Sequence, residues 1–100
     1  MMTVMLDGES YSLRPNFMAL QALEQESGTG LVTLARRFAE GAFTLADCVA
    51  VLRAGILGAG GVVPANLGAL IVAGGIAGIA GPVAQFLEAA ITGKLPEGKA

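Results

Sequence analysis

The sequence predicts an α+β fold that is mostly α, with an N-terminal β-hairpin packed on a bundle of four or five short helices. Two β-like segments joined by Asp7-Gly8 predict the hairpin. Apolar residues then recur at helical spacing, punctuated by glycine and proline, through most of the remaining chain. A chain of 100 residues has the length of one domain. We expect residues 1–93 to form this domain and residues 94–100 to be a flexible C-terminal tail.

The hairpin turn is predicted at Asp7 and Gly8, because a two-residue Asp-Gly loop suits the positive φ angles of the turn. Its register pairs Val4 with Tyr11 and Leu6 with Glu9, so that one face of the hairpin is apolar and the other mostly polar. A lone hairpin is only marginally stable in water and must dock on the helices. The apolar face carries Val4, Leu6, Tyr11 and Leu13.

The first helix is predicted over residues 15–27. Pro15 suits the first helical turn because its ring fixes φ and its missing N–H would have no partner there. Gly28 suits the left-handed residue that closes a helix. The apolar stripe of this helix is predicted to consist of Phe17, Leu20 and Leu23.

Charged residues in the first two helices suggest both solvated faces and partner contacts. Glu24, at the edge of the apolar stripe, is expected to reach solvent or to pair with Arg14 or Arg36. The alternative is a buried polar anchor for a partner. Arg36 and Arg37 are expected on a solvated face, with Glu40 one turn after Arg36. An anion-binding or acidic-partner patch is the alternative for this arginine pair.

Residues typical of helix ends mark the boundaries of the second and third helices. The second is clearly amphipathic, opens at residues 29–30 and ends at Gly41. Thr44 then predicts the N-cap of the third helix, and Asp47, at the third helical position, completes a capping box. Phe43 and Cys48 are expected to form a hydrophobic staple around this cap. Cys48 lies on the apolar stripe and is predicted to be a small buried hydrophobe.

Residues 54–87 contain no charged side chain and are rich in glycine. Pro64 predicts the first turn of a fourth helix that ends near residue 73, and Pro82 predicts the first turn of a fifth helix that ends at Gly93. Residues 74–81 between them fit either a weak helix or a bend. The two helices are expected to pack closely through three glycines without side-chain clash. These are Gly74, Gly78 and Gly81.

Four large apolar side chains in this uncharged segment must be buried if the protein is soluble. Each contributes roughly 1.5–3 kcal/mol when it is buried. They must therefore lie inside the domain or on a surface that binds a partner or a second copy of the chain. The partner-binding hypothesis concerns Ile71, Ile76, Ile79 and Phe86.

A small membrane-inserted protein is a further alternative. Residues 67–84 form 18 positions without a strongly polar side chain, the lower limit for a spanning helix. Only seven of them are Leu, Ile or Val, five are glycine, and no Trp or Tyr marks an interface. We therefore expect a segment that is buried or covered by a partner, and membrane insertion is the less favoured interpretation.

Composition disfavours enzyme chemistry and nucleic-acid binding. The chain has no histidine, one cysteine and no cluster of carboxylates at helical spacing, so no metal site and no catalytic base is predicted. Its glycine clusters do not match phosphate-binding loops, and no cofactor is expected. With six Lys and Arg and a net charge of −2, it lacks a basic surface for nucleic acid. Hydrophobic residues make up 54% of the chain, which suggests surface that lipid, another copy or a partner covers.

The ordered pattern of short motifs resembles a known family over nearly the whole chain. Residues 6–8 and 11–15 are followed by Phe17, Leu20, Leu23-Glu24 and Gly28. Residues 34–38 and Gly41 come next, and residues 80–84, Phe86-Leu87 and Gly93 close the pattern. The chain is similar to small tail proteins of gene transfer agents and related phages, which are grouped with phage tail assembly chaperones. It departs from that pattern in the glycine-rich stretch of residues 58–81.

The resemblance implies a role in tail assembly and assigns no catalytic residue. It implies a chaperone, acting in the cytoplasm of a bacterial host, that binds the tape measure protein and also meets tail tube subunits. A structural component of the tail tube is the alternative that the same family implies. A homo-oligomer is left open. A chaperone for apolar helices needs an adaptable apolar surface, which the excess of Ala, Gly, Met and Ile would supply.

Overall fold

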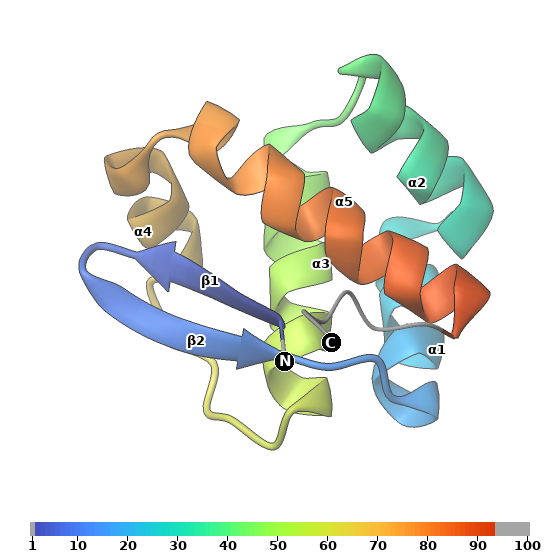
Figure 1. Ribbon diagram of the computed structural model, residues 1–100, viewed down its shortest axis with the longest axis horizontal. Coiled ribbons are helices and arrows are strands. Elements are labelled where there is room, and N and C mark those ends of the chain that lie inside the picture. Colours follow the sequence, from blue (N-terminus) through green and yellow to red (C-terminus); the bar gives the residue numbers. More distant parts are fainter. Residues whose placement is uncertain (1, 94–100) are drawn as a thin grey trace, which may run out of the picture.

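The computed structural model describes residues 2–93, and the predicted tail lies outside the described residues. It confirms the α+β, mostly helical class and the N-terminal hairpin (Figure 1). Two antiparallel strands are followed by five helices. In chain order these are β1 (Met2–Leu6), β2 (Glu9–Leu13), α1 (Phe17–Ser27), α2 (Leu31–Glu40), α3 (Leu45–Gly58), α4 (Leu67–Gly74) and α5 (Ile76–Thr92).

The hairpin forms in the predicted register. Asp7 has a φ of 51° and Gly8 a φ of 82°, so both turn residues adopt the positive φ that the Asp-Gly loop requires. Val4 pairs with Tyr11 and Leu6 with Glu9. The apolar face of the hairpin lies on α3 and α5, and β1 also contacts α4. This docking buries Met2, Val4, Leu6 and Leu13, leaves Tyr11 half-buried, and gives the hairpin the support that an isolated hairpin lacks.

Helix α3 is the centre of the molecule and contacts α1, α4, α5 and β2 (Figure 1). Two glycines let the chain pass closely over its C-terminal half. A Cβ at Gly55 would stand 2.9 Å from the Leu13 side chain, and one at Gly58 would stand 2.0 Å from the carbonyl oxygen of Arg14. The Arg14 N–H donates to the Gly55 carbonyl oxygen at 3.0 Å. The connection from the hairpin to α1 is therefore fixed across the end of α3.

Helix α1 starts two residues later than predicted. Asn16 is the N-cap and its Oδ1 accepts from the Ala19 N–H at 3.2 Å, so Pro15 precedes the helix instead of opening it. Gly28 closes the helix at a φ of 72°, as predicted. Phe17 was placed wrongly in the apolar stripe, because its side chain is exposed. Helix α3 ends beside Arg14 and Asn16, so the first turn of α1 lies at the end of this helix pair rather than inside it.

Helices α4 and α5 differ from the prediction in extent and in packing. Residues 76–81 are helical, so Pro82 lies inside α5 and not in its first turn. Gly75, at a φ of 90°, breaks the two helices apart, and their axes are bent by 115°. Pro64 likewise precedes α4. The expected close packing through glycine is wrong: a Cβ at Gly74, Gly78 or Gly81 would meet no atom within 4 Å.

The uncharged segment supplies much of the core. Ile71, Ile79 and Phe86 are fully or almost fully buried, together with Val83 and Leu87. Ile71, Ile79 and Phe86 therefore lie inside the domain and not on a surface that could bind a partner. Only Ile76 among the four hypothetical partner-binding residues is exposed.

Candidate interaction surface

The most polar buried cluster joins the end of α2 to the start of α3. Asp47 is only 5% exposed, and its Oδ2 accepts from the Thr44 N–H at 2.9 Å. Thr44 Oγ1 accepts from the Asp47 N–H at 3.0 Å, which completes the predicted capping box. Arg37 Nη1 donates to both carboxylate oxygens of Asp47, at 3.1 and 3.2 Å. The expectation that Arg37 is simply solvated is therefore wrong, and this cluster joins two helices internally.

Two aromatic side chains lie beside this cluster. Phe43 stacks on Phe38, with ring centroids 4.4 Å apart and planes 7° from parallel. Cys48 is buried, as predicted. Burial raises the pKa of the Cys48 thiol, the Asp47 carboxylate raises it further, and a backbone hydrogen bond opposes the rise. The thiol therefore stays protonated at neutral pH and is a poor nucleophile.

Glu24 caps the start of α2. Its Oε2 accepts from the Leu31 N–H at 3.1 Å, one of the unpaired donors at that helix N-terminus. Glu24 is exposed, so of the two outcomes expected for it the contact with solvent is the one observed. The ion pairs found among residues 2–93 join Arg37 to Asp47 and Arg53 to Glu26. The carboxylate of Glu24 already serves the fold at the α1–α2 connection.

No group of three or more potential metal ligands occurs among residues 2–93. A shallow hollow of about 270 Å³ lies between the end of β2 and the end of α5. Arg14 is its one charged side chain, and its other walls are Pro15, Ala89, Ala90 and Gly93. This hollow can accept a small apolar group beside a guanidinium but holds no acid–base pair.

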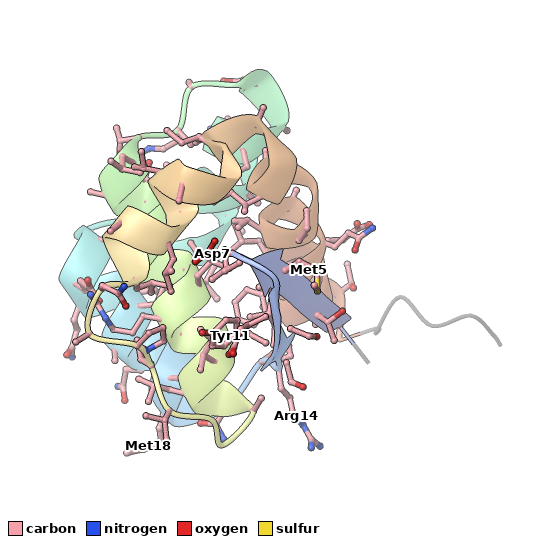
Figure 2. All side chains as sticks on the ribbon, turned by 90° about the vertical axis from the view of Figure 1, so that its left-hand side faces the viewer. Met5, Asp7, Tyr11, Arg14 and Met18 are labelled. Carbon is pink, nitrogen blue, oxygen red and sulfur yellow. The ribbon has the colours of Figure 1, made fainter. Side chains whose placement is uncertain are left out.

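Exposed apolar side chains gather where α1 begins and α3 ends. Phe17 is 75% exposed, Met18 72%, Leu57 52% and Val62 87%; these four residues are called the end patch. The backbone of Gly58 approaches Arg14 and Asn16 closely, so the end of α3 lies next to the chain that leads into α1. Figure 2 shows Met18 at the lower edge of the molecule. The four residues of the end patch come from the start of α1, the end of α3 and the connection that follows α3.

A second exposed apolar stretch runs over the bend between α4 and α5. Residues 72–78 are all exposed and none is charged. Val72 and Ile76 are its large side chains, and the rest are alanine and glycine. This stretch offers mainly backbone and small side chains, whereas the end patch offers an aromatic ring, a thioether and branched aliphatic groups.

Comparison with protein families decides the kind of protein. Residues 1–93 match the model of a family described as "Phage tail tube protein, GTA-gp10". The chain belongs to this family. No curated protein and no solved structure matches it. This protein of the GTA-gp10 family is accordingly a tail protein of phages or gene transfer agents, which confirms the tail part of the resemblance.

The membrane alternative concerns the helices that this GTA-gp10 family member forms from its uncharged segment. Within residues 2–93, none of the helices alone has the length and apolar composition to cross a bilayer. Helices α4 and α5 satisfy those criteria only as a pair, with the 115° bend between them.

Sequence reasoning missed most of the surface that this GTA-gp10 family member exposes. Phe17 was assigned to the apolar stripe of its helix. The periodicity of that helix does not show that α3 ends before it can cover Phe17. Met18 lies off the predicted stripe, which was the one available signal. Val62 lies in a loop bounded by Gly61 and Pro64, where an apolar residue has no periodic pattern to join.

Proposed function

We propose that this tail protein is an assembly chaperone that binds apolar helical segments of the tape measure protein through its end patch. It acts in the cytoplasm of the bacterial host, before tube subunits polymerise around the tape measure. The observation that carries the proposal is the exposure of Phe17 and Met18 at the start of α1, with Leu57 and Val62 exposed at and after the end of α3, which approaches the chain before α1. Each such side chain gains roughly 1.5–3 kcal/mol on burial, so their exposure favours a protein partner.

The chemistry of the end patch suits a partner that varies along its length. Met18 is unbranched and polarisable, and it can adapt to different neighbouring side chains. Phe17 supplies a large rigid surface of the kind that dominates binding energy at interfaces. An amphipathic helix presents its anchors to such a surface at i, i+3, i+4 and i+7. A long helical tape measure would supply such anchors repeatedly.

A structural component of the tail tube is the second candidate, because the matched family is described as a tail tube protein. In that role the end patch would be a contact between neighbouring subunits in the particle. Self-association of the isolated protein through the end patch would favour this candidate or a homo-oligomeric chaperone. Light scattering after gel filtration measures it.

Mass spectrometry of purified, mature particles separates the two candidates. A chaperone leaves before the particle is complete, so its peptides should be absent while those of the tape measure and the tube subunit are present. A tube component should be present at a copy number comparable with that of the other tube subunits. Detection at that level would overturn the chaperone proposal.

A further inference from the structure

The hollow between the end of β2 and the end of α5 adjoins the end patch along the chain. Arg14 and Pro15 form one wall of the hollow, and Phe17, the first residue of the end patch, follows directly after Asn16. Figure 2 shows the side chains of Arg14 and Met18 both at the lower edge of the molecule. A helical partner that crosses this edge can contact the end patch and the hollow together.

The backbone of Arg14 is held firmly at the wall of the hollow. Its N–H donates to the Gly55 carbonyl oxygen at 3.0 Å. Its own carbonyl oxygen lies so close to Gly58 that a Cβ there would stand 2.0 Å away. Pro15, the next residue, disfavours the helical conformation for Arg14. The guanidinium therefore extends from an ordered backbone, and a partner that binds it has to order only one side chain.

The charge of Arg14 is not neutralised by the described part of the chain. Arg14 is the only charged residue in the walls of the hollow, and the end patch contains none. The ion pairs within residues 2–93 join other arginines to acidic residues and leave the guanidinium of Arg14 without a carboxylate. A guanidinium beside exposed apolar side chains complements a partner that places a carboxylate there.

Small residues in the last turn of α5 leave room beside this guanidinium. The walls that α5 contributes are Ala89, Ala90 and Gly93, and the hollow measures about 270 Å³. The C-terminal end of a helix carries a partial negative charge, which disfavours a carboxylate deep in the hollow. An acidic ligand therefore lies with its aliphatic stem against the alanines and its carboxylate outward, at the guanidinium. Glutamate, with its longer stem, fits this arrangement better than aspartate.

We propose that Arg14 and the hollow bind a glutamate side chain of the same tape measure segment that the end patch covers. The partner is then an apolar helix with an acidic residue beside its apolar anchors. The anchors supply most of the affinity, and Arg14 discriminates between apolar segments with and without a carboxylate at the right position. This inference rests on the proposed function and specifies the chemistry of its partner.

A double-mutant cycle between the protein and a tape-measure fragment tests the contact. The fragment, and variants in which each glutamate in turn is replaced by glutamine, are titrated into wild-type protein and into Arg14→Gln. At low salt, Arg14→Gln and one of the glutamate replacements should each weaken binding by about fivefold, and together they should weaken it no further. High salt should remove these differences. Arg36→Gln, which removes an exposed arginine on α2, should bind like wild type.

The inference is overturned if Arg14→Gln binds like wild type, if its effect multiplies with that of every glutamate replacement, or if the binding fragment contains no glutamate. A purely structural role of Arg14 at the C-terminal end of α5 predicts a lower urea midpoint for Arg14→Gln with unchanged affinity. The variant Phe17→Ser with Met18→Ser separates this inference from the proposed function. If that folded variant binds like wild type, the end patch is not the binding surface. If it binds weakly while Arg14→Gln binds like wild type, only the role of Arg14 fails.

A carboxylate from a second copy of the chain is the competing occupant of the hollow. In that case the wild-type protein should self-associate at low salt and Arg14→Gln should stay monomeric. Light scattering after gel filtration measures both proteins. Self-association that Arg14→Gln abolishes would overturn the assignment of the hollow to the tape measure.

Discussion

Removal of the Asp47 carboxylate tests how α2 and α3 are held together. In Asp47→Ala the Thr44 N–H loses its acceptor at 2.9 Å, and Arg37 loses two bonds at 3.1 and 3.2 Å. Hydrogen bonds to a charged group are worth about 1.5–3 kcal/mol, and loss of a helix cap costs about 0.5–2 kcal/mol. Thr44 is exposed and Arg37 partly so, so water replaces part of both losses. We expect the free energy of unfolding to fall by about 2 kcal/mol.

Urea denaturation followed by circular dichroism measures this change. A loss of about 2 kcal/mol corresponds to a fall in Tm of about 8–16 °C for a domain of this size. Arg36→Gln is the matched control, because Arg36 is exposed and the bonds to Asp47 come from Arg37 and Thr44; it should stay within about 0.5 kcal/mol of wild type. A double-mutant cycle of Arg37→Gln with Asp47→Ala gives the coupling energy of the pair. The reasoning is refuted if Asp47→Ala is no less stable than Arg36→Gln.

Three further predictions follow from burial and backbone angles. Gly8→Val should lower stability by at least about 1 kcal/mol in a urea melt, because valine resists a φ of 82° although the space around it is open; an unchanged midpoint would contradict this. Ile79→Asp should unfold or aggregate because Ile79 is buried, whereas Ile76→Asp should remain folded; equal behaviour in gel filtration would be inconsistent with the packing of α5. The raised pKa of Cys48 stabilises the fold below the ordinary cysteine pKa of about 8.5, and this contribution is lost as pH rises through that value toward the higher folded pKa. The urea midpoint should therefore fall with pH over this range in wild type relative to Cys48→Ala, and parallel pH profiles would show that the thiol contributes nothing.

The parts of the fold that were predicted from sequence depend on local chemistry. Asp7-Gly8 specified the turn and, through it, the register of the hairpin, because few residues accept positive φ. Gly28 and Gly41 closed their helices for the same reason. The capping box at Thr44 needed only the side chains and backbone of a single helical turn. Such features are complete within a few residues.

The parts that were missed depend on where a neighbouring element ends. Periodicity placed Phe17 on a stripe, but exposure depends on how far α3 extends, which the sequence of α1 does not contain. The spacing of Gly78 and Gly81 shows that a helix could approach closely, but no helix lies there. Arg37 looked like a solvated residue because its partner, Asp47, lies ten positions away on the next helix. The buried positions of Ile71, Ile79 and Phe86 were stated as one of two alternatives, which composition alone did not separate.

Binding of a tape-measure fragment to the end patch tests the proposed function most directly. The fragment is titrated into wild-type protein, into Phe17→Ser with Met18→Ser, and into Val32→Ser, an exposed apolar control on α2. Two apolar anchors are together worth roughly 3 kcal/mol or more, so the double variant should bind at least about 100-fold more weakly, with an unchanged urea midpoint. Val32→Ser should bind like wild type. Equal affinity of all three folded proteins would contradict the assignment of the end patch as the binding surface.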